Sequence, residues 1–380
     1  MKILFITDIA PFPVKGGEKL RSYGLLRILS ELDCEVFAII GQSENQDYRE
    51  FKSTNIHFTE FDFGVINSGK RFKDFSRLFK RHQSFTDKID EVISTHSIDI
   101  AFIDYHYYGQ YINYLKKQNI KVIYGTHNAQ ATLYLKLPVN SFRAKLSKIK
   151  GYYLRSLHER FFFKKSDAFI TVSDEDKIYH QKFVNKDKVY LIPNFLMEEE
   201  YEKQISKNKQ DYIVMTGNFN AKQNKVGLEW FVRSVWDIEL QNRIKLVLAG
   251  LNSTNILEDL GKKYNTNNIE ALGELDDLKP AIAQAKIGIV PLLDGSGTRL
   301  KCIESMALKT QLVSTSKGAE GIHHDGSILI ADSPDEFKKS ILNILDKNID
   351  YTEKAYDIFK TTYSFQPNKK VFEQIIKDIT

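Results

Sequence analysis

The hydrophobic positions of the chain fall into short apolar runs that alternate with amphipathic stretches. The first run is Lys2–Thr7, and apolar residues then recur at helical spacing over Glu18–Glu31. Later runs in the first half predict further strands at Val36–Ile40, Ile98–Ile103, Lys121–Tyr124, Ala168–Val172 and Lys188–Ile192. Strands that alternate with helices indicate a parallel, doubly wound sheet.

The same pattern starts again after the charged stretch Glu198–Gln210. A helix is predicted at about Val226–Trp236, and Gln366–Ile379 has a helical pattern with no strand of its own. Strands are predicted at Tyr212–Thr216, Lys245–Ala249, Ile269–Leu272, Ile287–Val290, Gln311–Ser314 and Ser327–Ile330. We therefore expect an α/β protein with domains at 1–197 and 198–363, and a closing helix, 364–380, that crosses back to the first domain.

Composition narrows the class of protein. The chain has 380 residues, of which 42% are hydrophobic, enough for two cores and too many for a disordered chain. Its two cysteines argue against a disulfide framework and favour a reducing cytoplasm. The short apolar N-terminus does not resemble a signal peptide, and no stretch approaches the ~20 apolar residues of a membrane span.

The most informative stretch is a strand-to-helix junction at residues 290–306. An apolar run ends at Val290, and a turn with two glycines, 295–297, precedes a helix pattern. Glycines let the backbone approach a ligand, and the first N–H groups of a helix have no partner within it. Arg299 and Lys301 add positive charge, and Glu304 follows where a ribose hydroxyl would lie. The junction predicts a nucleotide site, although a plain connecting turn is the competing interpretation.

Two features of the first half point to the same kind of site. Gly16 and Gly17 precede a helix, which fits either a simple turn or close approach to a phosphate. His127 follows a predicted strand, where a ligand of an open α/β sheet binds, so it is either a structural histidine or a contact to a donor sugar. Asp104 and His106 follow another strand and are weaker candidates.

No group of residues has convincing metal-ligand spacing. Asp174-Glu175-Asp176 matches an Asp-x-Asp metal signature, but Ser173 and Asp176 also have the spacing of a helix capping box. The capping interpretation is favoured because the acidic residues lie in the first turn of the predicted helix. We therefore expect no metal and no other cofactor.

Two stretches of the first half are strongly basic. Residues 69–82 carry six lysines and arginines against one aspartate, and residues 141–165 carry eight against one glutamate. Such runs are often solvated helix faces, but basic amphipathic helices also bind anionic membranes. No nucleic-acid motif accompanies them. We therefore expect an anionic membrane surface, and no nucleic acid, as a partner.

Together these residues resemble glycosyltransferase family 4, of the GT-B type. The strongest similarity is in residues 295–307 and 313–322, supported by Thr-His-Asn at 126–128 and Ile-Pro-Asn at 192–194. The resemblance implies two Rossmann-like doubly wound parallel-sheet domains that face a central cleft. It also implies retaining transfer of a sugar from a nucleotide diphosphate sugar, normally without a metal.

The resemblance also assigns roles to particular residues. Arg299 and Lys301 would contact the diphosphate, Glu304 the ribose and His127 the donor sugar. The backbone N–H groups of Gly297 and Thr298 would assist at the diphosphate, Leu272 would border the base, and Gly16, Gly17, Asn218, Asn224 and Ser296 complete the expected donor site.

The sequence departs from the family at two of these positions. Ser296 stands where a glutamate is common, and Asn218 stands where an arginine is common. Three functions therefore remain open. A glycosyltransferase would use a glycan or lipid-linked acceptor in surface polysaccharide or glycolipid synthesis, as a cytoplasmic protein peripheral on the inner face of the membrane. The alternatives are a nucleotide-sugar epimerase of the same fold and a catalytically degenerate nucleotide-sugar binding protein.

Overall fold

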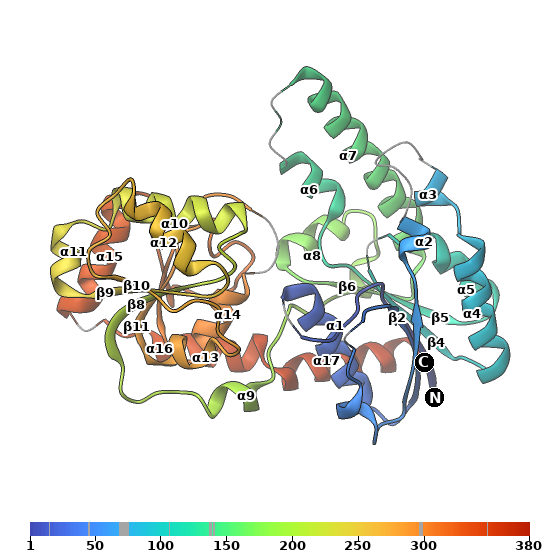
Figure 1. The fold of residues 1–380 in the computed structure, drawn as a ribbon. Coiled ribbons are helices and arrows are strands. Elements are labelled where there is room, and N and C mark those ends of the chain that lie inside the picture. Colours follow the sequence, from blue (N-terminus) through green and yellow to red (C-terminus); the bar gives the residue numbers. More distant parts are fainter. Residues whose placement is uncertain are drawn as a thin grey trace. The chain divides into compact units, whose positions relative to one another are not determined.

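The computed structural model describes residues 1–14, 16–44, 46–67, 76–105, 107–136, 139, 141–295, 299–347 and 349–380. The chain forms two compact units, coloured along the sequence in Figure 1. The first unit comprises Met1–Phe195 together with Asn368–Thr380, and the second comprises Leu196–Pro367. Each unit has its own parallel sheet and its own buried core.

The first unit is built on a seven-stranded sheet in the order β3-β2-β1-β4-β5-β6-β7. Its strands are β1 (Lys2–Ile6), β2 (Glu35–Gly41), β3 (Ile56–Phe61), β4 (Ile100–Asp104), β5 (Lys121–Gly125), β6 (Ala168–Thr171) and β7 (Val189–Leu191). All neighbours are parallel, and Ile3 of β1 is in register with Val36 of β2 and Ile100 of β4. The sequence analysis missed β3, because this edge strand alternates apolar with polar residues and is only partly buried.

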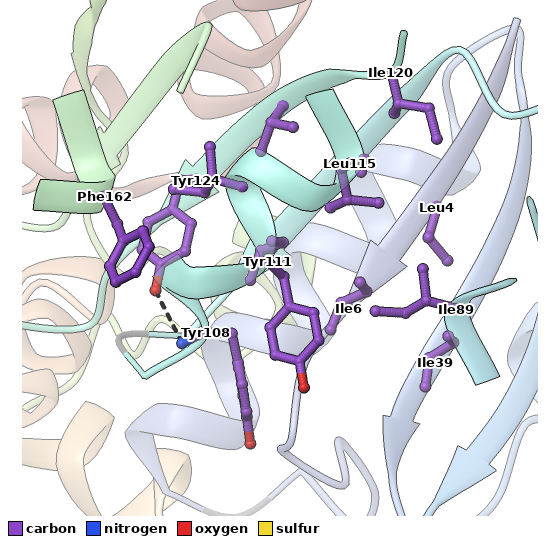
Figure 2. Close-up of a cluster of buried hydrophobic side chains, with 14 of the residues drawn as sticks. Leu4, Ile6, Ile39, Ile89, Tyr108, Tyr111, Leu115, Ile120, Tyr124 and Phe162 are labelled. Atoms are coloured by element: carbon purple, nitrogen blue, oxygen red, sulfur yellow. Dashed lines mark hydrogen bonds between the residues drawn. The ribbon is translucent and has the colours of Figure 1, made fainter. Parts of the chain in front are cut away.

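Helices cover this sheet and close its core. They include α1 (Gly17–Ser30), α2 (Gly64–Asn67), α3 (Ser76–Phe79), α4 (Gln83–His96), α5 (Ile112–Lys117), α6 (Gln130–Lys136), α7 (Phe142–Phe162) and α8 (Asp174–His180). Figure 2 shows aliphatic side chains such as Ile6 and Leu115 beside the buried Tyr111. The Tyr124 hydroxyl accepts a 3.2 Å hydrogen bond from the backbone N–H of Tyr108, so a buried polar group is satisfied within the core.

The second unit repeats the design with a six-stranded parallel sheet in the order β10-β9-β8-β11-β12-β13. Its strands are β8 (Gln210–Thr216), β9 (Lys245–Ala249), β10 (Ile269–Ala271), β11 (Ala285–Val290), β12 (Gln311–Ser314) and β13 (Ile328–Ile330). Its helices are α9 (Glu198–Glu202), α10 (Lys222–Ser234), α11 (Ile238–Arg243), α12 (Ser253–Gly261), α13 (Lys279–Gln284), α14 (Leu300–Ala307), α15 (Pro334–Lys347) and α16 (Thr352–Ile358). The two doubly wound parallel sheets confirm the predicted fold class.

The last helix, α17 (Phe365–Ile379), begins in the second unit, and its residues from Asn368 belong to the first. Its apolar face packs on the first sheet, where the ring of Phe372 lies 5.3 Å from that of Phe102. Lys369 pairs with Glu31 of the first unit at 2.8 Å. This segment therefore contributes to the core of a sheet whose last strand, β7, ends at Leu191.

In both sheets the order in which the chain adds strands reverses between two neighbouring central strands. Chain order runs outward from β1 on one side and from β4 on the other, and likewise from β8 and β11 in the second sheet. Ligands of open α/β sheets bind beyond the carboxyl ends of the strands at such switch points. We therefore expect functional residues in the loops after β1 and β4 and in those after β8 and β11.

Candidate functional site

The loops at the switch point of the second sheet are joined through Lys301. Its Nζ donates a 2.8 Å hydrogen bond to Oδ1 of Asn224 at the start of α10. The Asn224 amide nitrogen donates in turn to the backbone oxygen of Asn218, also at 2.8 Å. Burial lowers the pKa of Lys301 to about 8. The structure thus brings together three residues that the sequence analysis placed in the donor site.

Gly217 makes this arrangement possible. Its φ is 145°, and a Cβ at this position would lie 2.7 Å from Lys301 Nζ. A side chain here would have to displace the ammonium group. Gly217 was not among the predicted site residues, because nothing in the sequence shows that Lys301 lies against it.

Arg299 lies immediately before α14 and is only 6% exposed. Its guanidinium donates from Nη2 to the backbone oxygen of Gly295 at 3.1 Å and from Nε to that of Lys317 at 3.2 Å. It also lies 3.7 Å from the Glu320 carboxylate. The side chain therefore ties the glycine turn after β11 to the loop after β12, and its charge is held at the switch point.

Glu304 lies one turn beyond Lys301 on α14. The hydroxyl of Tyr201, from α9, donates to its Oε1 at 3.4 Å. Burial raises the pKa of Glu304 to about 7, although the Lys301 charge opposes this. Tyr201 was missed, because the sequence analysis treated 198–210 as a charged connection.

The rest of the predicted donor site in the second unit comprises Leu272 and the three residues that follow Gly295. Leu272 follows β10 and keeps a partly exposed side chain, as a residue bordering a base requires. Ser296, Gly297 and Thr298 lie outside the described residues. The first residue of α14 is Leu300.

In the first unit, His127 and Asp104 form a buried pair at the carboxyl ends of β4 and β5. Nε2 of His127 lies 2.9 Å from Oδ2 of Asp104, and Nε of Arg21 donates to Oδ1 at 3.1 Å. Burial alone would raise the pKa of Asp104, but the charges of Arg21 and His127 outweigh it and hold the pKa at about 2. An ionised carboxylate only accepts hydrogen bonds, so Nε2 carries a hydrogen and the ring orientation is fixed. The sequence analysis ranked Asp104 as a weaker candidate and missed Arg21. His106 lies outside the described residues.

The loop after β1 carries a further carboxyl group that the sequence analysis missed. The Tyr108 hydroxyl donates to Oδ2 of Asp8 at 3.0 Å, and burial raises the pKa of Asp8 to about 7. Gly16, with φ of 89°, precedes α1, and Gly17 is the first residue of that helix. A Cβ on Gly16 would meet no atom within 4 Å, so its backbone angle, rather than crowding, favours glycine there.

The acidic run at 174–176 caps a helix. The Ser173 hydroxyl accepts from the Asp176 backbone N–H at 3.2 Å and lies 2.9 Å from its Oδ2, while Oδ1 accepts from the Ala129 backbone N–H. The predicted capping interaction is confirmed. Within the described part of the chain, no three His, Cys, Asp or Glu side chains are grouped to hold a metal ion. In the same residues no helix combines the length and apolarity needed to cross a membrane.

Two families match consecutive parts of the chain. Residues 16–199 match Glycosyltransferase Family 4, and residues 210–347 match Glycosyl transferases group 1. The first match contains His127 and the Gly16–Gly17 turn. The second contains Asn218, Lys301 and Glu304. The two matches thus include both switch points described above.

Two relatives align over nearly the whole chain. An uncharacterised 44.6 kDa protein of the Klebsiella pneumoniae cps region is 25% identical, with 99% of each chain covered. A Campylobacter jejuni protein is 25% identical, with 91% of this chain and 89% of that protein covered. The latter is an α-1,4-N-acetyl-D-galactosaminyltransferase that acts on a GalNAc-containing undecaprenol diphosphate.

Solved structures with the same fold include Anabaena HepE in complex with UDP, with a TM-score of 0.69, 11% identity and coverage of 99% of this chain and 100% of that one. A Rickettsia africae glycosyltransferase has a TM-score of 0.66, 16% identity and coverage of 100% and 98%. An E. coli trehalose-6-phosphate structure with bound UDP-2-fluoro glucose has a TM-score of 0.66, 13% identity and coverage of 100% and 99%. At these identities the likeness establishes the fold alone.

Proposed function

Because the chain belongs to the family 4, group 1 glycosyltransferases of the GT-B type, we propose that it transfers a sugar from a nucleotide diphosphate sugar to a glycan or lipid-linked acceptor. We further propose that the anomeric configuration is retained and that the product belongs to a surface polysaccharide or glycolipid. The observation that carries the proposal is the Lys301–Asn224–Asn218 connection beside Arg299 at the switch point of the second sheet.

The donor diphosphate binds at this switch point in our proposal. Lys301 and Arg299 supply two cations that are already held in place and largely removed from water, where their attraction for an anion is strong. A bound diphosphate favours the charged form of Lys301, whose pKa burial has lowered to about 8. The resemblance to the family also assigns Ser296 and the backbone N–H groups of Gly297 and Thr298 to the donor, and these three residues lie outside the described part of the chain.

These charges also bear on catalysis. The diphosphate gains negative charge as the bond to the sugar breaks, so fixed cations lower the barrier more than they strengthen ground-state binding. With two protein cations at the leaving group, the proposed reaction needs no metal. Glu304 accepts from a ribose hydroxyl, with Tyr201 holding the carboxyl, and Leu272 borders the base.

The first unit contributes His127 to the donor sugar. Asp104 fixes the imidazole through Nε2, and in our proposal the ring held in this orientation contacts a hydroxyl of the donor sugar. The Gly16–Gly17 turn at the start of α1 approaches the donor through its backbone. We place no proton transfer on His127, whose proposed role is to orient the sugar.

Two observations support a lipid-linked acceptor. The Campylobacter relative acts on an undecaprenol-linked glycan, and the Klebsiella relative is encoded in a cps region. Basic residues are also concentrated in the sequence at 141–165 and 69–82, and such stretches favour an anionic membrane as a partner. We propose that the protein works on the cytoplasmic face of the membrane as a peripheral protein.

A two-stage experiment tests the proposed function. Thermal unfolding with UDP-, GDP-, dTDP- and ADP-sugars identifies the donor, because a ligand that binds only the native state raises its stability. The donor is then incubated with and without a polyprenyl-diphosphate-linked glycan, and free nucleotide and product anomer are measured. Acceptor-dependent nucleotide release with a retained anomer supports the proposal. An epimerised donor without acceptor indicates an epimerase, and binding without release indicates a degenerate binding protein; either result overturns it.

A further inference from the structure

Helix α7 exposes a continuous apolar stripe. Its members are spaced four, three, four and four residues apart, which places them on one face of the helix. They are Phe142, Leu146, Ile149, Tyr153 and Leu157, and their exposed fractions run from 47% to 77%. Solitary exposed apolar residues are ordinary, but a row over four turns indicates a binding surface.

The opposite face of α7 attaches the helix to the first unit. Gly151 lies against the ring of Tyr134 from α6, where a Cβ would come within 2.7 Å of ring atoms. Glu159 accepts hydrogen bonds from the Ala131 backbone N–H at 3.0 Å and from the Tyr179 hydroxyl at 2.8 Å. Figure 1 shows α6 and α7 projecting away from the first sheet. The stripe therefore faces away from the surface that packs on α6.

The charges on α7 specify what covers the stripe. Arg143, Lys145 and Lys150 are exposed beside it, and among the described residues none of the three forms an ion pair. Glu159 is the only acidic residue of the helix, and it is buried. A second copy of α7 would bring like charges together, whereas an anionic bilayer offers both a counter-charge and an apolar interior.

We propose that α7 lies in the headgroup region of an anionic bilayer, with its stripe inserted toward the acyl chains and its basic residues among the lipid phosphates. The proposal rests on the membrane association proposed above and names the side chains that enter the lipid. It is independent of the donor site in the second unit. Amphipathic helices of this kind bury their apolar face a few ångströms into the bilayer.

Vesicle binding by matched variants tests the proposal. The probe is vesicles of phosphatidylcholine with phosphatidylglycerol, and the stripe variant is Leu146→Gln with Ile149→Gln. The control is Ile178→Gln with Ile238→Gln, which removes two isoleucines that are somewhat more exposed than Leu146 and Ile149 but lie on other helices. We expect at least a tenfold loss of vesicle affinity in the stripe variant and less than twofold in the control, with unchanged thermal unfolding in both. Equal affinity of the stripe variant and the wild type would overturn the insertion.

A fluorescent label reports insertion directly. Both native cysteines are buried, so a thiol-reactive, polarity-sensitive dye attaches selectively to Ile149→Cys or to Ser147→Cys, an exposed site off the stripe. On vesicles we expect a blue shift and protection from iodide at 149 and neither at 147. Binding without a change at 149 would refute insertion and leave membrane association standing. Absence of vesicle binding would refute both insertion and membrane association. Sugar transfer would still be tested separately by acceptor-dependent nucleotide release. A lipid-free dimer that the stripe variant disrupts would assign the stripe to self-association and overturn the proposal.

Discussion

Lys301 and Asn224 are 77 residues apart, yet the Lys301 ammonium donates to the Asn224 side-chain oxygen at 2.8 Å. The contact joins α14, which follows β11, to α10, which follows β8, and β8 and β11 are neighbouring strands. It holds a buried cation at the point where a parallel sheet binds its ligand. The first two predictions concern this contact.

Replacing Lys301 with methionine is expected to weaken nucleoside diphosphate binding by roughly 10- to 100-fold, the value of one charge-assisted hydrogen bond. Binding of the nucleoside without phosphate should change far less, and Arg299→Ala should show the same difference. Lys286→Met, which removes a lysine that pairs with Asp211, serves as the control. Calorimetric titration with both ligands makes the measurement. A similar loss for nucleoside and diphosphate would contradict the assigned role.

Gly217→Ala is expected to weaken diphosphate binding by about tenfold, because its new methyl group displaces the Lys301 ammonium. The positive φ also costs roughly 1–2 kcal/mol of stability. Gly326→Ala separates the two effects, since Gly326 has φ of 77° but open space around its Cβ position. Both variants should unfold at lower temperature, and only Gly217→Ala should bind diphosphate less tightly. Equal affinity in the two variants would remove Gly217 from the site.

His127→Gln is expected to lower the rate of sugar transfer by roughly 10- to 100-fold while leaving nucleoside diphosphate affinity unchanged. The reason is that the proposed partner of His127 is a hydroxyl of the donor sugar, which the free diphosphate lacks. Initial rates with the nucleotide sugar are compared with affinity for the diphosphate alone. A parallel fall in both would place His127 at the diphosphate instead.

The contribution of Glu159 to stability is expected to fall as the pH rises from about 4.5 to about 7. Burial raises the pKa of the Glu159 carboxyl to about 7, so the folded state binds a proton over this range that the unfolded state has released. One such group contributes a slope of at most about 1.4 kcal/mol per pH unit. Glu159→Gln, measured by urea unfolding at several pH values, should flatten the profile, and Glu175→Gln on the surface should not. An unchanged slope in Glu159→Gln would show that Glu159 is ionised in the folded protein.

Much of the fold was predictable because buried parallel strands are nearly continuous apolar runs. Lys245–Ala249 and Gln311–Ser314 match β9 and β12 residue for residue. The edge strand β3 was not predicted, because an edge strand is partly exposed to solvent and its apolar run is therefore less distinct. The Ser173 cap was also predictable, because capping is a local interaction within one turn.

The residues proposed for the donor site could be named from the sequence, but the residues that contact them could not. Arg21, Asp8, Gly217 and Tyr201 have no distinguishing sequence pattern. Each has a role only because the fold brings it into contact with a residue far away in sequence, as Arg21 contacts Asp104. Short motifs record local backbone requirements, whereas side-chain contacts between loops depend on the order of strands in the sheet.

The sequence by itself determined the alternation of strands and helices, the family and the charged turn near residue 299, because each follows from local spacing of residue types. The tertiary structure alone decided which charges are buried against which partners, and with them the pKa values of Asp104, Lys301 and Glu304. It also decided that the apolar stripe of α7 stays exposed. The spacing of apolar residues in a helix is the same whether its apolar face packs in a core or is exposed to solvent. Burial is a property of the packed chain, and only packing separates these two cases.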